Sequence, residues 1–167
     1  MRRFRMTQEL DLGVEEHWRL FFDPEFERGL YLEHMRFPKY ELVEQREDGD
    51  KITRRERVTP RLDVPAAVAK VLGPSFGYVE DGTFDKKSRT WRCRILPNVL
   101  TDRLSCDMTV TCAELAPERC RRTVETSIDA RIFAIGGLVE SAFEKSLRDG
   151  WENSAGYIVK IARAKRT

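Results

Sequence analysis

Polar and apolar residues alternate along most of the chain, and this alternation predicts strands. Residues 3–12 show the pattern clearly, because Phe4, Met6 and Leu10 share one face while charged residues occupy the other. The same period recurs in six further segments that are bounded by turn residues such as Asp48-Gly49. The predicted strands lie at residues 3–12, 37–47, 51–59, 76–85, 89–96, 103–114 and 120–133.

Apolar residues at helical spacing predict three short helices and one long helix. Val14, Trp18 and Phe21 fall on one face of a first helix. Asp23-Pro24 has the form of a helix start, because aspartate caps a helix and proline fits its first turn. A third short helix is expected after Pro60, closed by Gly73-Pro74. The predicted helices lie near residues 14–22, 24–34, 65–72 and 135–161.

The final helix carries small residues at every fourth position of its inward face: Ala142, Ser146, Gly150 and Ser154. An interior glycine costs a helix about 1 kcal/mol relative to alanine, so Gly150 requires a reason. Either the helix backbone approaches the sheet closely, or the small side chains leave space under the helix. In the second interpretation that space is bounded by larger residues, which are Phe143, Leu147, Trp151 and Tyr157.

Four polar residues share the inward face of the predicted strands with apolar neighbours: Gln8, Arg54, Glu56 and Glu80. Each would cost a dry core about 1 to 3 kcal/mol if it lacked a partner. We interpret them as polar contacts inside a mostly apolar pocket, with a bulge that turns them outward as the open alternative. The candidate ligand-binding residues are Gln8, Tyr40, Arg54, Glu56, Tyr78, Glu80, Trp91, Met108, Thr126, Phe143, Ser146, Leu147, Gly150 and Ser154.

This order of elements, with two helices after the first strand and a long helix at the end, resembles the START-like superfamily. The group is also called SRPBCC or birch-pollen-allergen-like. The resemblance spans essentially the whole chain and is carried by RFRMTQELDL, VEEHWRLFFDPEFERGL and IGGLVESAFEKSLRDGWENSAGYIVKIAR. It implies a single α+β domain over residues 1–167 with a helix-grip fold, in which a curved seven-stranded antiparallel sheet wraps around the C-terminal helix. It also implies a cavity for a hydrophobic ligand, but no superfamily catalytic motif is present.

Motifs that suggest catalysis or metal binding have the wrong context here. GPSFG at residues 73–77 matches the G-x-S-x-G string of serine hydrolases, yet a helix precedes it and a strand follows, the reverse of a nucleophile elbow. No phosphate-binding glycine loop and no H-E-x-x-H motif occurs. The cysteines lack zinc or dithiol spacing and are interpreted as reduced thiols within strands: Cys93, Cys106, Cys112 and Cys120. No catalytic residue, metal site or cofactor is predicted.

Two alternatives to a binding protein stay open. Glu56, Glu80 or a tyrosine would serve a cyclase- or hydrolase-type enzyme if burial raised the pKa of the carboxyl group. A protein-binding module related to chaperone activators, with a filled core, is the other alternative. His17 and His34 lie among apolar residues, and both are interpreted as structural.

Charge excludes some partners, because 30 Lys and Arg nearly balance 28 Asp and Glu. Nucleic acid is therefore not an expected partner. Basic clusters, interpreted mainly as solvated faces, occur at residues 2–5, 54–57, 119–122 and 160–166. If the terminal clusters meet in space, transient contact with an anionic membrane surface is a further hypothesis. No run of about 20 apolar residues and no signal-peptide core occurs, so a cytoplasmic protein is expected.

We therefore expect a protein that binds a hydrophobic small molecule or lipid between the sheet and the last helix, and that serves in its transport or sensing. Entry is expected through loops near residues 60–75, 97–102 and 134–137, where Gly136-Gly137 would let the start of the helix shift. No oligomeric state is predicted. The deciding question is whether space exists beneath Ser146 and Gly150.

Overall fold

The computed structural model describes residues 1–166, with side chains through Lys165. Every predicted strand is present, with ends that differ from the prediction by at most three residues. In chain order the elements are β1 (Arg2–Leu10), α1 (Val14–Phe21), α2 (Pro24–Arg28), η1 (Gly29–His34), β2 (Lys39–Asp48), β3 (Lys51–Thr59), α3 (Ala66–Leu72), β4 (Tyr78–Asp85), β5 (Thr90–Pro97), β6 (Leu104–Ala116), β7 (Arg119–Ala130) and α4 (Gly136–Arg166).

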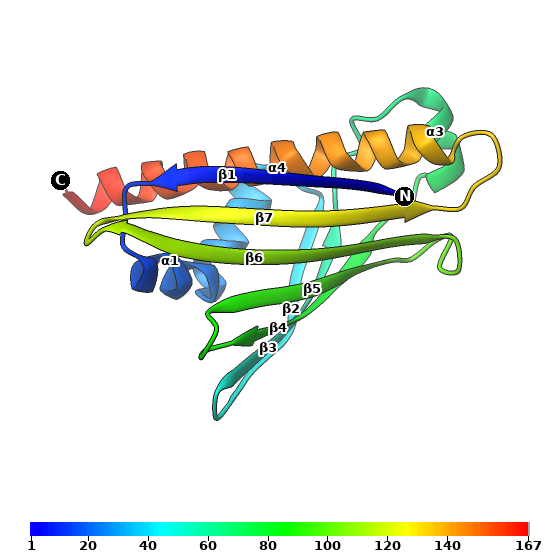
Figure 1. Cartoon of the computed structure of the whole chain (residues 1–167). Coiled ribbons are helices and arrows are strands. Elements are labelled where there is room, and N and C mark those ends of the chain that lie inside the picture. Colours follow the sequence, from blue (N-terminus) through cyan, green and yellow to red (C-terminus); the bar gives the residue numbers. More distant parts are fainter. Residues whose placement is uncertain (167) are drawn as a thin grey trace.

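The seven strands form one open antiparallel sheet in the order β1-β7-β6-β5-β4-β3-β2. Helix α4 runs alongside β1, whereas β3 and β4 slant away from it, so the sheet is strongly curved (Figure 1). Contacts of α4 with β1, β7 and η1 close one side of the curved sheet. The α+β helix-grip fold expected from the sequence is thereby confirmed.

The predicted second helix is divided into α2 and a turn of π-helix, η1. As predicted, Asp23 caps α2: its Oδ1 accepts hydrogen bonds from the backbone N–H groups of Glu25 and Phe26. The π turn begins at Gly29, where any side chain would collide with the hydroxyl group of Tyr157 on α4. The glycine therefore lets η1 pack directly against the last helix.

Helix α4 extends five residues beyond the predicted end at residue 161. Its start is held by Glu140, whose Oε1 accepts a hydrogen bond from the Ala130 backbone N–H at 3.0 Å. Two charged residues of α4 outside the predicted inward face also contact β1: the Arg148 guanidinium lies 4.5 Å from the centre of the Phe4 ring, and Glu144 pairs with Arg2 at 3.1 Å. The packed stripe of α4 is therefore wider than the sequence pattern predicted.

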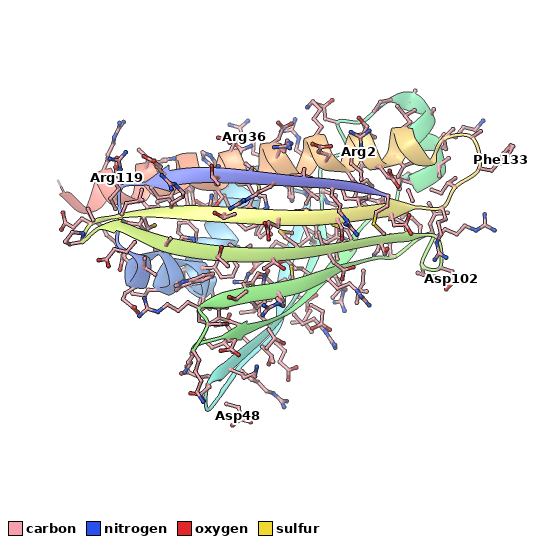
Figure 2. All side chains as sticks on the ribbon, in the orientation of Figure 1. Arg2, Arg36, Asp48, Asp102, Arg119 and Phe133 are labelled. Carbon is pink, nitrogen blue, oxygen red and sulfur yellow. The ribbon has the colours of Figure 1, made fainter. Side chains whose placement is uncertain are left out.

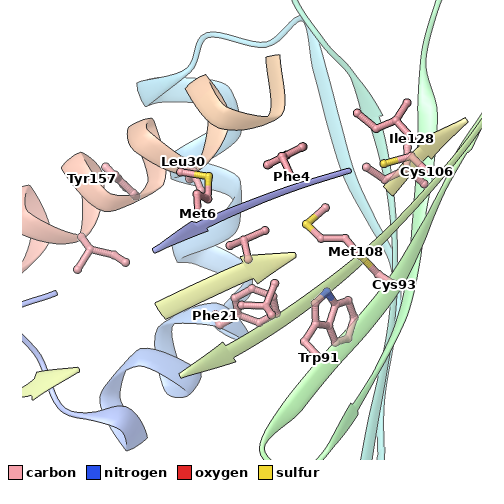
Figure 3. Packing of buried hydrophobic residues seen from close by; sticks show 14 of the residues in the cluster. Phe4, Met6, Phe21, Leu30, Trp91, Cys93, Cys106, Met108, Ile128 and Tyr157 are labelled. Carbon is pink, nitrogen blue, oxygen red and sulfur yellow. The ribbon is translucent and has the colours of Figure 1, made fainter. Parts of the chain in front are cut away.

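The hydrophobic core lies between the concave face of the sheet and the helices. Phe21 packs its ring 5.5 Å from Trp91, and Figure 3 shows both beside Cys93 and Met108. All four cysteines are free thiols, three of them buried and Cys112 partly buried. The strand alternation therefore places these sulfur atoms on the core side, as the sequence predicted.

The terminal basic clusters do not meet. The cluster at residues 2–5 begins at the start of β1, beside the first turns of α4, while residues 160–165 lie near the opposite end of β1 (Figure 1). Arg2 and Arg119 likewise lie toward opposite ends of the molecule (Figure 2). None of the helices within residues 1–166 is long and apolar enough to cross a membrane.

Candidate functional site

A cavity of about 100 Å³ lies between the sheet, η1 and α4. Its walls are mainly apolar and aromatic, formed by Leu20, Phe21, Phe26, Leu30, Met35, Phe37, Ile95, Met108, Leu147, Trp151 and Ile158. Polar side chains complete the lining: His17, Glu27, Tyr31, Arg54, Tyr78, Glu80, Arg122, Ser146 and Ser154. This space is smaller than the cavity of about 150 Å³ that holds benzene, so it admits at most a body of about one aromatic ring.

Gly150 lines the cavity, which answers the question raised by the small residues of α4. A Cβ atom placed on Gly150 would meet no other atom within 4 Å. The helix backbone therefore does not press against the sheet at this point. Of the neighbouring small residues, Ser146 and Ser154 also line the cavity.

The cavity opens beside Ser146, the one exposed residue among those that line it in the described part of the chain. Met35 and Phe37, which follow η1, are partly exposed and also line the cavity. No residue of the loops at 60–75, 97–102 or 134–137 lines it, and the expected entry route stays a prediction. A side chain at Gly136 would collide with the Ala130 carbonyl oxygen, so the start of α4 is closely packed.

Arg54 is the centre of a buried charged cluster on β3 and β4. Its Nε lies 3.3 Å from Glu56 Oε2, and its Nη2 lies 4.0 Å from Glu80 Oε1. Its Nη1 donates a hydrogen bond to the Phe21 carbonyl oxygen. The Tyr40 hydroxyl donates to Glu56 Oε1 at 2.6 Å. The polar residues of β3 therefore point inward, and two carboxylates offset the charge of one guanidinium.

Glu56 and Glu80 are directly opposite each other in the β3–β4 pairing. Burial raises the pKa of Glu80 to about 7, and the neighbouring Glu56 carboxylate adds to the rise. Burial also raises the pKa of the Tyr40 hydroxyl, which donates a hydrogen bond to Glu56. Glu80 can therefore gain or lose a proton near neutral pH inside the cavity.

Arg122 lies in the interior, although sequence reasoning placed it in a solvated basic cluster. Its side chain is 1% exposed and lines the cavity. It donates to Gln8 Oε1, to Ser154 Oγ and to the Trp151 carbonyl oxygen. The sequence contained a signal for this burial, because position 122 has the same inward parity on its strand as Cys120 and Val124.

Glu27 and His17 are two further cavity residues that sequence reasoning did not assign to the site. Glu27 is 6% exposed, makes no hydrogen bond through its side chain within the described residues, and has a pKa raised well above its ordinary value by burial. His17 is 1% exposed, and neither ring nitrogen has a hydrogen-bond partner among these residues. Burial lowers the pKa of His17 to about 3, so its ring is neutral.

The predicted site residues divide into two groups. Those that line the cavity are Arg54, Tyr78, Glu80, Met108, Ser146, Leu147, Gly150 and Ser154. Those that do not reach its surface are Gln8, Tyr40, Glu56, Trp91, Thr126 and Phe143. Gln8 instead contacts Arg122, and Glu56 contacts Arg54. Trp91 packs against the ring of Phe21, and Phe143 packs against the ring of Phe76.

The lining is suited to holding an apolar body with several polar contacts, and to moving a proton at Glu80. No group of three or more His, Cys, Asp or Glu side chains within residues 1–166 is arranged to hold a metal ion. GPSFG has the context expected from the sequence, with α3 before it and β4 after it.

Solved structures with the same fold include an aromatase/cyclase, norcoclaurine synthase and a START superfamily protein. The Zhui aromatase/cyclase from Streptomyces sp. R1128 is 14% identical, with a TM-score of 0.66 over 99% of this chain and 96% of that chain. Norcoclaurine synthase from Thalictrum flavum, in complex with dopamine and hydroxybenzaldehyde, is 14% identical, with a TM-score of 0.65 over 98% and 87%. A START superfamily protein from Mycobacterium smegmatis is 12% identical, with a TM-score of 0.63 over 95% and 98%.

At such low identity these similarities show the fold alone, and they confirm the START-like resemblance. A search of curated proteins found no match. One family model matches residues 5–161, nearly the whole chain, and its description is "Protein of unknown function (DUF2505)". The chain therefore belongs to the DUF2505 family and has the START-like fold.

Proposed function

We propose that this protein binds a small, mainly apolar molecule in the cavity between α4 and the sheet. The observation that carries the proposal is the open space beneath Gly150, in a helix position where alanine would be more stable. A cavity with apolar walls and a few convergent polar groups is the usual form of a small-molecule site. Transport or sensing of that molecule is the role that fits best.

The test fills the cavity from Gly150. The variant Gly150→Leu places a side chain into the space, and the matched control Gly137→Leu adds the same side chain at an exposed position of α4. Toluene titrated into labelled protein should shift NMR resonances of cavity residues in the wild type and in the control, but not in Gly150→Leu. Wild-type protein in which toluene shifts no cavity resonance would refute the proposal. Native mass spectrometry of gently purified protein would then identify the natural ligand.

An enzyme is the second candidate, and Glu80 is the observation that favours it. Its carboxyl group lines the cavity and has a pKa of about 7, which is suited to a general acid or base at neutral pH. Tyr31 and Tyr78 line the same cavity, and burial raises the pKa of both hydroxyl groups. Two proteins of the same fold, an aromatase/cyclase and norcoclaurine synthase, are enzymes by name.

Turnover by wild-type protein of the ligand identified by mass spectrometry would distinguish the two functions. Loss of that turnover in Glu80→Gln, with toluene binding retained, would establish catalysis. Binding without turnover would leave a carrier or sensor. The third alternative, a chaperone-activator-like module, predicted a filled core, which the cavity does not support.

A further inference from the structure

The Arg122 guanidinium is a buried cation whose hydrogen-bond partners are all neutral. Nε and Nη2 donate to Gln8 Oε1, Nη2 also donates to the Trp151 carbonyl oxygen, and Nη1 donates to Ser154 Oγ at 3.1 Å. No Asp or Glu oxygen of the described residues forms an ion pair with it. Burial lowers the pKa of Arg122 to about 10, as expected when a charge leaves water without a counter-charge.

One N–H bond of Arg122 is free to face a ligand. An arginine has five N–H bonds, one on Nε and two on each terminal nitrogen. The four observed hydrogen bonds occupy the Nε bond, both Nη2 bonds and one Nη1 bond. The second Nη1 bond has no partner among the described residues, and Arg122 lines the cavity.

His17 lines the same cavity and supplies a further hydrogen-bond donor. Burial and the charge of Arg122 lower its pKa to about 3, so its ring is neutral and carries one N–H bond. Neither ring nitrogen has a hydrogen-bond partner among the described residues. Glu27 lines the cavity as well, and burial raises the pKa of its carboxyl group well above its ordinary value. An unused donor of His17 therefore accompanies the buried charge of Arg122 at this cavity.

We propose that the ligand of this cavity carries a carboxylate group that pairs with Arg122 and accepts a hydrogen bond from His17. This inference rests on the proposed function and names the chemical class of the ligand. A carboxylate supplies the missing counter-charge and accepts several hydrogen bonds. An ammonium group would meet a like charge at Arg122, and an alcohol would leave that charge unbalanced.

The test compares three probes of similar size with different charge. Benzoate, benzyl alcohol and benzylamine share the aromatic ring that the cavity volume admits. Each is titrated into wild-type protein at neutral pH, and its Kd is taken from NMR shifts of cavity residues. Benzoate should bind about tenfold to a hundredfold more tightly than benzyl alcohol, because a hydrogen bond to a charged group is worth that factor. Benzylamine should bind most weakly.

The variant Arg122→Met tests whether Arg122 causes the preference for benzoate over benzyl alcohol. This variant should lose the advantage of benzoate over benzyl alcohol while still binding benzyl alcohol. Arg121→Met is the matched control, because Arg121 is exposed on the same strand and pairs with Glu9 at 3.2 Å. It should bind benzoate like the wild type. The wild-type comparison of probes stands even if Arg122→Met fails to fold.

The outcomes distinguish failure of this inference from failure of the proposed function. Equal or tighter binding of benzyl alcohol or benzylamine by the wild type would overturn the inference that the ligand carries a carboxylate. The proposed binding function would still stand. An Arg122→Met protein that keeps the full preference for benzoate would overturn the role of Arg122. Failure of all three probes and of toluene to bind would overturn the proposed function and this inference together.

Discussion

Two buried arginines lie at the same cavity in opposite electrostatic surroundings. Arg54 forms ion pairs with Glu56 and Glu80, whereas Arg122 forms hydrogen bonds only with neutral groups of β1 and α4 within the described residues. Burial alone would lower the pKa of both guanidinium groups. At Arg54 the carboxylates of Glu56, Glu27 and Glu80 outweigh burial and raise the pKa, while at Arg122 the pKa falls to about 10.

The difference indicates that the two arginines have different roles. Arg54 is neutralised within the protein and ties β3 and β4 to the end of α1 through the Phe21 carbonyl oxygen. Arg122 keeps one unused N–H bond and an unbalanced charge beside the cavity. We therefore regard the Arg54 cluster as a structural support and the Arg122 side as the position for a ligand's anionic group.

Removing each arginine in turn gives the largest expected effect. Arg54→Met should lower the free energy of unfolding by about 3 to 5 kcal/mol, because it leaves two buried carboxylates without their cation. Arg122→Met should cost only about 1 to 2 kcal/mol, since it removes hydrogen bonds to neutral groups. Urea unfolding followed by circular dichroism measures both values. Equal losses would contradict the distinction between the two sites.

The Arg54 side should also respond to pH. The pKa of Glu80 is about 7 in the folded protein, against an ordinary value of 4.5, so the folded state holds this proton more tightly than the unfolded state. Its contribution therefore favours folding at low pH and is lost, by about 2 to 3 kcal/mol, as pH rises from about 4.5 to 7. Glu27 acts in the same direction, because its pKa is also raised.

Glu80→Gln tests that assignment. The variant should flatten the decline in unfolding free energy between pH 5 and 7.5 relative to the wild type. Glu41→Gln is a suitable control, because Glu41 is an exposed carboxylate on β2 that pairs with Arg57. A decline of unchanged slope in Glu80→Gln would show that Glu80 does not titrate in this range.

The tyrosines beside the Arg54 cluster give a smaller effect. Tyr40→Phe should cost about 1 to 2 kcal/mol, because Glu56 Oε1 loses the donor that lies 2.6 Å away. Tyr31 stacks on Tyr40 with 4.8 Å between ring centres, but its hydroxyl makes no hydrogen bond within the described residues. Tyr31→Phe is therefore the matched control and should change thermal stability little. The reverse order of the two losses would contradict this account of the cluster.

Gly150→Ala gives the smallest expected change in stability, and this change is an increase. Alanine is favoured over glycine inside a helix by about 0.5 to 1 kcal/mol, and its methyl group would meet no atom within 4 Å. The melting temperature of ligand-free protein should therefore rise. A fall would mean that the helix approaches the sheet more closely at Gly150 than the structure shows.

The strands and helices were predictable because alternation and turn residues are local signals, whereas their arrangement was implied by the resemblance to the START-like superfamily. Strands such as β3, with Arg54 and Glu56 on the inward parity, lie where the pattern placed them. The small residues of α4 left two alternatives open, and the structure has space beneath Gly150 rather than a close approach to the sheet. The sequence did not predict which inward side chains reach the cavity. Trp91 faces inward as expected, yet Phe21 from α1 covers it, and no pattern within one strand indicates such a cover.

Arg122 and Glu27 were missed for a related reason. Both are charged residues in segments rich in charge, so composition favoured a solvated position for each. Their burial depends on partners from distant segments, such as Gln8 on β1 and Ser154 on α4 for Arg122. The parity of Arg122 was the only local signal, and it conflicted with the usual exposure of arginine.

The most direct test of the central claim is a crystal structure of the protein grown with benzoate. The account predicts electron density for the ring between α4 and the sheet, beneath Gly150. It also predicts a carboxylate oxygen within hydrogen-bond distance of Arg122 Nη1. A cavity closed by side chains, or benzoate bound only outside it, would contradict the claim that α4 covers a ligand site.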